Sequence, residues 1–255
     1  AAHWFFMGHG KEFDSDIKEP LVRGDFYWPA MPERNHHDAF SEPQPTEEYL
    51  EDWLLRCCEL VDRYKPKLIY FDWWIQHSSF RPYLKKFAAY YYNRMSEQGE
   101  AGVITYKHDA FMFGTAVVDI ERGQFAKAKP YFWQTDTTVA QNSWCYTENN
   151  YYKSPNQILC DLVDIVSKNG MLLLNIGPKA DGSIPAEDRH ILLEIGKWLK
   201  VNGEAIYGSK VWRESGEGPT KTPEGQFTDG EVKQFTSEDI RFTVNGGYLY
   251  ATVLN

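Results

Sequence analysis

Cysteine, basic charge and long apolar runs are all scarce in this chain of 255 residues, and each shortage excludes a class of protein. Its four cysteines, Cys57, Cys58, Cys145 and Cys160, show no CxxC spacing, so the sequence suggests no zinc site and leaves the redox compartment open. Lys and Arg number 27 against 36 Asp and Glu, and the net charge of -9 repels nucleic-acid phosphates and anionic lipids. No apolar run approaches about 18 residues. The sequence therefore predicts neither a nucleic-acid nor a membrane partner.

The first six residues lack the basic, apolar and cleavage regions of a signal peptide, and they are typical of the middle of a core strand. Aromatic residues are abundant at 16% of the chain, with 9 Trp and 16 Tyr. Sugar-binding clefts use such rings because the C–H faces of pyranoses stack on them, although many domains simply pack their rings in the core.

Strands and helices alternate along residues 68–199, after an irregular stretch at 8–45 that is rich in Pro, Gly, His and charge. Helical spacing of apolar residues predicts helices from Thr46 to the residue before Pro66, over 80–96, over 154–169 and over 185–199. Apolar runs predict strands at 68–71, 103–106, 116–120, 131–133 and 171–176. A polar Thr/Asn/Ser stretch is expected after 133, and a hairpin at 240–254 around Asn245-Gly246.

This alternation predicts an α/β fold with a parallel sheet, either a barrel or a doubly wound sheet. The barrel is favoured because polar residues collect at or just after strand ends, where a TIM barrel places its catalytic groups. These residues are Asp72, Lys107, Glu121, Gln134 and Asn175. We expect a partial (β/α)8-like barrel over 1–205, followed by the start of a β-sandwich over 206–255.

Two carboxylates follow apolar strands. Asp72 stands in Tyr70-Phe71-Asp72-Trp73-Trp74, and Glu121 precedes Arg122. Taken singly, Asp72 is better explained by a structural loop cap, and Glu121 by an ordinary surface pair with Arg122. Taken together they suggest glycosidic bond hydrolysis with retention, which needs two carboxyl groups about 5–5.5 Å apart. Their separation of 49 residues (121 minus 72) requires different strands and does not fix the distance.

Several longer motifs carry a family resemblance. They are Tyr70-Phe71-Asp72-Trp73-Trp74, residues 117–124 (VVDIERGQ), residues 133–138 (WQTDTT) with Asn142-Ser143-Trp144, residues 162–170 (LVDIVSKNG), residues 174–178 (LNIGP) and Asp181-Gly182. Over nearly all of residues 1–213 the chain resembles glycoside hydrolase family 29. The resemblance implies a retaining α-L-fucosidase that needs no cofactor and no metal, with a barrel followed by a β-sandwich.

Site residues follow from the same resemblance. Asp72 matches the family nucleophile, and Glu121 matches the acid/base, with Glu148 as the fallback because this segment varies in length. Substrate contacts are implied for His3, Trp4, Tyr70, Trp73, Lys107 and Trp144. A surface lysine competes with the role of Lys107, and ring packing competes with that of Trp144. The implied partner is a fucosylated oligosaccharide or glycoconjugate.

Two departures from the family pattern lead to further expectations. The family takes sugar contacts, including a His-His pair, from early strands that are not found before Ala1, so we expect an incomplete barrel whose first strands precede this segment. His36-His37 lies in the Pro-rich stretch and is interpreted as a loop feature. The rivals are a non-catalytic sugar-binding relative and a glycosidase for a related sugar such as galactose. The resemblance favours an extracytoplasmic location and leaves homo-oligomeric assembly open.

Overall fold

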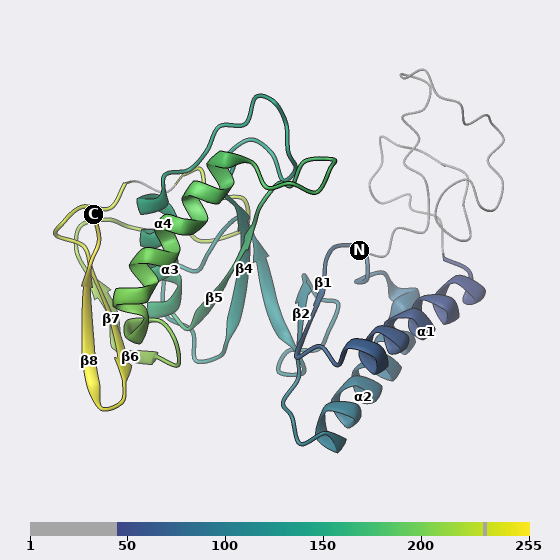
Figure 1. Ribbon diagram of the computed structural model, residues 1–255. Coiled ribbons are helices and arrows are strands. Elements are labelled where there is room, and N and C mark those ends of the chain that lie inside the picture. Colours follow the sequence, from purple (N-terminus) through teal and green to yellow (C-terminus); the bar gives the residue numbers. More distant parts are fainter. Residues whose placement is uncertain (1–44, 232–233) are drawn as a thin grey trace. The chain divides into compact units, whose positions relative to one another are not determined.

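The computed structural model describes residues 45–231 and 234–255, which belong to two compact units, Ala1–Val117 and Val118–Asn255 (Figure 1). The expectations for residues 1–44, including the first strand, His3, Trp4 and His36-His37, lie outside the described residues. The domain boundary expected at residue 205 stays a prediction. No helix in the described ranges is long and apolar enough to cross a membrane.

The described part of the first unit, from residue 45 on, contains two helices and two parallel strands. Helix α1 (Glu47–Tyr64) begins at Thr46, whose hydroxyl accepts a hydrogen bond from the Tyr49 amide, and it ends at Lys65 in the left-handed conformation, before Pro66. The other elements are β1 (Leu68–Phe71), the 3-10 turn η2 (Ser78–Phe80), α2 (Arg81–Glu97) and β2 (Val103–Lys107). Strands β1 and β2 pair in parallel from Leu68↔Val103 to Phe71↔Tyr106. The helices and strands predicted between Thr46 and residue 106 are confirmed.

Aromatic rings form the core of the first unit. The side chains of Phe80, Phe87 and Tyr91 are fully buried, and the Trp53 ring meets Phe80 edge-on with 5.2 Å between centroids. The expectation that β1 is covered on both faces is met only in part, because Phe71 is buried whereas Leu68 is 43% exposed.

The second unit contains three parallel strands covered by helices. Strand β3 (Val117–Glu121), which begins at the last residue of the first unit, pairs with β4 (Trp133–Thr138), and β4 pairs with β5 (Gly170–Asn175). Helix α3 (Pro155–Ser167), capped by the Ser154 hydroxyl, and helix α4 (Ala186–Asn202) pack against β5 through Ile158, Ile191 and Ile195. The 3-10 turn η3 (Gly203–Ala205) follows α4.

Strand β4 differs from the prediction. It was expected at 131–133 and instead runs from Trp133 to Thr138, through residues expected to form a polar loop. Its polar side chains are buried because each of three finds a partner inside the unit. Gln134 donates to Asp119 Oδ2 at 2.6 Å, Thr135 donates to the Ile120 carbonyl at 2.8 Å, and Thr137 donates to Asp229 Oδ2 at 2.9 Å. Internal partners remove the cost of burying these groups.

An antiparallel sheet follows in the second unit, with the order β6 (Lys210–Glu217), β7 (Ile240–Asn245) and β8 (Tyr248–Val253). The predicted hairpin is confirmed, but its turn residues are Gly246 and Gly247, with φ of 56° and 84°, because Asn245 pairs with Tyr248. Two positive φ values are the geometry that a two-residue hairpin turn requires. Figure 1 shows this sheet beside α3.

A buried ionic cluster joins α3 to β7. Asp164 is completely buried, and its carboxylate accepts hydrogen bonds from Lys168 Nζ at 2.6 Å and from Arg241 Nε. Thr222 Oγ1 lies 3.3 Å from the same carboxylate. Because Lys168 and Arg241 are also almost fully buried, Asp164 compensates two charges that have little access to water.

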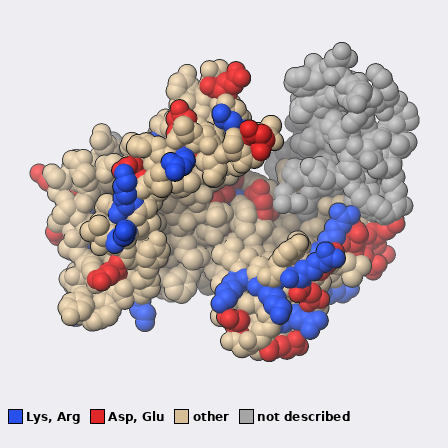
Figure 2. All heavy atoms as spheres, viewed as in Figure 1, with Lys and Arg blue, Asp and Glu red and all other residues tan. Residues whose placement is uncertain are grey.

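We predict that Asp164→Asn lowers the free energy of unfolding by about 3–5 kcal/mol, because it leaves two buried cations without their counter-charge. Urea denaturation of the intact protein measures this change. The matched control is Glu59→Gln, which removes an exposed carboxylate paired with Arg63 at 2.8 Å on α1. Figure 2 shows acidic and basic side chains interspersed on the surface of the protein. An exposed ion pair such as Glu59–Arg63 contributes about 0–1 kcal/mol to the free energy of unfolding. Equal losses in the two variants would contradict the prediction.

Candidate active site

Asp72 lies directly after β1, at the carboxyl end of the strand, and is half-buried. The Tyr70 hydroxyl donates a hydrogen bond to Asp72 Oδ1 at 3.2 Å. Two residues later the chain turns sharply, since Trp74 has a φ of 84°. The ring of Trp73 meets the ring of His108 edge-on, with 4.3 Å between centroids. The sequence therefore holds one carboxylate at a strand end, bonded to a tyrosine and followed by aromatic side chains.

Lys107 ends the neighbouring strand β2, and its side chain is fully buried. The register pairs Phe71 with Tyr106, so Asp72 and Lys107 are the next residues of two adjacent parallel strands. The Lys107 ammonium lies 5.9 Å from the centre of the Tyr70 ring. Burial rules out the alternative of a surface lysine, because a cation that is 0% exposed has no access to water.

Glu121 is the last residue of β3 and is half-buried, opposite Asp136 in β4. Arg122 follows in the left-handed conformation, with a φ of 46°, and its amide donates to the Asp136 carbonyl at 2.8 Å. Its guanidinium makes an ion pair with Asp229 at 3.0 Å, and it also donates to the Gln141 carbonyl at 2.7 Å. The ion pair joins Arg122 to a residue 107 positions away in the sequence, so the arginine is held by the fold.

Trp144 and Glu148 lie in the loop between β4 and α3. Trp144 is half-buried, and the Arg122 guanidinium lies 5.6 Å from its ring centre. The Trp144 carbonyl accepts a hydrogen bond of 2.7 Å from Asn175, the last residue of β5. Glu148 is exposed. The second unit thus brings Glu121, Arg122 and Trp144 together near the carboxyl ends of its parallel strands.

Asp229 is a site-region residue that the sequence analysis missed. Its Oδ2 accepts hydrogen bonds from Arg122 Nε at 3.0 Å, Thr137 Oγ1 at 2.9 Å and Lys153 Nζ at 2.8 Å. Burial opposes ionisation of Asp229, but the hydrogen bond and charge of Lys153, followed by those of Arg122, hold its pKa below the usual value. No local pattern around residues 224–231 signals this network, because the partners of Asp229 lie 76 to 107 residues away.

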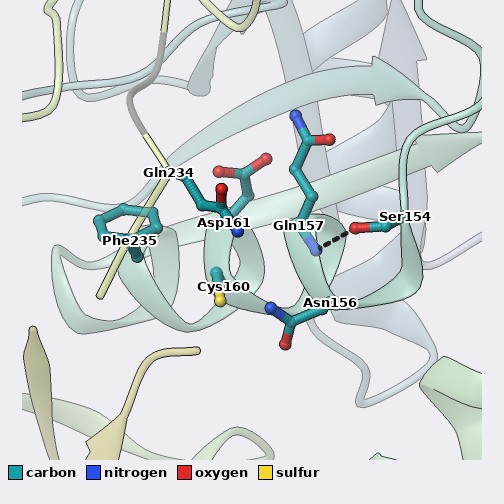
Figure 3. A pocket seen from close by; sticks show the side chains of 7 residues that line it. All are labelled: Ser154, Asn156, Gln157, Cys160, Asp161, Gln234 and Phe235. Carbon is teal, nitrogen blue, oxygen red and sulfur yellow. Dashed lines mark hydrogen bonds between the residues drawn. The ribbon is translucent and has the colours of Figure 1, made fainter. Parts of the chain in front are cut away.

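A cavity of about 300 Å³ lies beside the first turns of α3 (Figure 3). The residues that line it are Ser154, Asn156, Gln157, Cys160, Asp161, Gln234 and Phe235. Burial raises the pKa of Asp161 to about 7 against the opposing charge of Lys153. None of the residues predicted from the sequence to act in catalysis or binding lines this cavity.

The structure therefore places the predicted residues in two groups. Asp72, Tyr70, Trp73 and Lys107 belong to the first unit, whereas Glu121, Trp144 and Glu148 belong to the second, and His3 and Trp4 lie outside the described residues. The first group offers a carboxylate for nucleophilic attack, and the second offers a carboxyl group for proton transfer. Within the described ranges, no group of three His, Cys, Asp or Glu side chains is placed to hold a metal ion.

Comparison with known proteins identifies the family. The family model described as alpha-L-fucosidase matches residues 18–204. Tissue alpha-L-fucosidase of Rattus norvegicus is 33% identical over 172 residues, which cover 62% of this chain and 36% of the rat protein. Plasma alpha-L-fucosidase of Pongo abelii is 30% identical over 189 residues, which cover 67% of this chain and 37% of the relative.

A solved structure shows the same fold. The Thermotoga maritima alpha-fucosidase in complex with fucose is 29% identical, with a TM-score of 0.61 over 81% of this chain and 42% of that one. The chain spans less than half the length of these relatives. The family match covers most of the chain and includes Asp72, Lys107, Glu121 and Trp144. The chain belongs to the alpha-L-fucosidase family, glycoside hydrolase family 29.

Proposed function

We propose that the protein containing this chain is a retaining α-L-fucosidase, which removes terminal α-L-fucosyl residues from oligosaccharides or glycoconjugates. The observation that carries the proposal is the Asp72 carboxylate, which stands at the end of β1 with a hydrogen bond from Tyr70 and the buried Lys107 at the next position of the neighbouring strand. The family match that includes these residues supports the sugar and the reaction class.

In the proposed reaction, Asp72 attacks the anomeric carbon of the fucosyl residue, and the bond to the leaving oxygen breaks. Glu121 gives its proton to that oxygen, and the leaving group departs as an alcohol. The fucosyl residue stays bound to Asp72 as a covalent ester. Glu121, now a carboxylate, then takes a proton from water as the water attacks the same carbon. The ester bond to Asp72 breaks, and fucose leaves with its original configuration after two inversions.

The neighbouring side chains are assigned supporting roles. The Tyr70 hydroxyl orients the Asp72 carboxylate for attack, and Lys107 supplies a buried positive charge at the same strand ends. Trp73 and Trp144 are half-buried rings that can stack on the C–H face of the sugar. His3 and Trp4 remain predicted substrate contacts.

The larger setting is also part of the proposal. The parallel strands of both units belong to a partial (β/α)8-like barrel, and the sheet β6–β8 begins a β-sandwich. The relatives include proteins named plasma alpha-L-fucosidase, which supports an extracytoplasmic location.

We predict that the intact protein hydrolyses 4-nitrophenyl α-L-fucoside and that Asp72→Gly lowers the turnover by several orders of magnitude, because no covalent intermediate can form. Azide restores activity to Asp72→Gly by filling the space of the carboxylate and attacking directly. The product is then the inverted β-L-fucosyl azide, which NMR identifies.

The matched control is Glu100→Gly, which removes an exposed carboxylate just before β2, where it pairs with Lys67 at 2.9 Å. This variant keeps its full turnover. Near wild-type turnover in Asp72→Gly would refute the nucleophile assignment. A protein that binds fucosides without hydrolysing them would be the non-catalytic relative, and preferential hydrolysis of α-galactosides would change the assigned sugar.

We predict that Glu121→Ala lowers kcat/KM about 10²- to 10⁴-fold on a fucosyl disaccharide, whose leaving alcohol needs a proton. The loss is much smaller on 2-chloro-4-nitrophenyl α-L-fucoside, because that phenolate leaves without protonation. Azide attacks the covalent intermediate without a general base, so it raises the turnover of Glu121→Ala and yields the retained α-L-fucosyl azide.

The exposed Glu148 provides the comparison for this experiment. Glu148→Ala keeps the wild-type ratio of the two kcat/KM values. If Glu148→Ala instead shows the dependence on the leaving group and Glu121→Ala does not, Glu148 is the acid/base.

A further inference from the structure

Residues 224–229 run alongside the segment that begins with Glu121. The amide of Phe227 donates to the Glu121 carbonyl at 2.8 Å, and the amide of Asp229 donates to the Arg122 carbonyl at 2.8 Å. A third backbone bond joins the Gly225 amide to the Gln124 carbonyl at 3.1 Å. The 224–229 segment is thus bonded to the chain at Glu121 and immediately after it, within the second unit.

The contact between the two segments depends on glycine. A Cβ atom added to Gly123 would overlap the carbonyl oxygen of Gly225, so a larger residue at 123 cannot lie against this segment. Gly225 itself has a φ of 128°, a conformation that side chains with a Cβ rarely adopt. Both backbones therefore approach more closely than other residue types permit, and the approach occurs two residues after Glu121.

Asp229 fixes this segment to the rest of the site through its charge. It is 16% exposed, and its Oδ2 joins three parts of the fold, namely Arg122 after β3, Thr137 in β4 and Lys153 before α3. The Lys153 side chain is only 3% exposed, and its ammonium group makes an ion pair with Asp229 at 2.8 Å. Burial opposes ionisation, but the hydrogen bonds and charges of Lys153 and Arg122 lower the pKa of Asp229, so its carboxylate is charged at neutral pH.

We propose that Asp229 is a positioning residue for Glu121. This inference rests on the proposed function, in which Glu121 transfers the proton. Arg122 carries the effect, because its backbone is held by Asp136 and Asp229 and its guanidinium by Asp229 and Gln141. The 224–229 segment lies beyond residues 18–204, which the family model matches, so the proposal gives a role in catalysis to a part of the chain outside that match.

The test compares Asp229→Asn with Glu121→Ala in the intact protein, using kcat/KM on a fucosyl disaccharide and on 2-chloro-4-nitrophenyl α-L-fucoside. Asp229→Asn keeps the shape of the side chain and loses its charge. We expect kcat/KM on the disaccharide to fall about 10- to 100-fold, which is the effect of a small misplacement of a catalytic group. The value for the activated phenyl fucoside falls much less, as it does in Glu121→Ala.

Glu224→Gln is the matched control in the same segment. The Glu224 carboxylate is 49% exposed, lies 3.4 Å from Lys129 Nζ and accepts a bond of 3.3 Å from the Ala126 amide. Its removal leaves Asp229 in place, so both kcat/KM values stay at the wild-type level. Gly123→Ala provides a second route to the same effect, because its added methyl group displaces the 224–229 segment while the Asp229 side chain keeps its charge. We expect the same dependence on the leaving group.

The outcomes separate the two proposals. If Glu121→Ala shows the dependence on the leaving group and Asp229→Asn leaves kcat/KM unchanged or lowers it equally for both substrates, the positioning role is wrong while the acid/base assignment stands. If Glu121→Ala lacks that dependence, the acid/base assignment fails and the positioning role fails with it. Circular dichroism of Asp229→Asn separates a local effect from unfolding. If Asp229→Asn is unfolded, Gly123→Ala decides the question, and a folded and fully active Gly123→Ala protein would overturn the proposal.

Discussion

Parallel hydrogen bonding between neighbouring strands is the constraint that determines where the candidate site residues lie. In a parallel pair, residues at matched positions leave the sheet at the same edge. The register of β1 and β2 therefore brings Asp72 and Lys107 to one edge, although they are 35 positions apart (107 minus 72). The register of β3 and β4 pairs Glu121, the last residue of β3, with Asp136, which lies two residues before the end of β4. Each unit thus places its own candidate site residues at or near the carboxyl ends of its strands.

Buried charge stabilises the second unit at two places and serves a different purpose at each. Asp164 joins α3 to β7 through its ion pairs with Lys168 and Arg241. This cluster stabilises the packing of the antiparallel sheet against α3. Asp229 joins the end of β3 to β4 and to the start of α3. A buried pair costs desolvation energy whether or not it serves catalysis, so its location determines what it contributes.

Local patterns predicted the elements but not their long-range partners. The apolar spacing and the caps at Thr46 and Ser154 located α1 and α3, because a cap and a helical face are encoded within a few residues. Strand β4 was misplaced because its Gln and Thr side chains look like a loop until their partners are known. Asp229 was missed for the same reason, since its role depends on Lys153 and Arg122, whose positions only the fold determines.

The central claim is that Asp72 and Glu121 act on opposite sides of one anomeric carbon with retention. The most direct test is the distance between their carboxyl groups in a crystal structure of the intact protein with a bound fucose analogue. The proposed mechanism predicts a separation of about 5–5.5 Å. A separation of about 6.5–9.5 Å, which leaves room for a water molecule between carboxylate and sugar, would indicate inversion and contradict the claim.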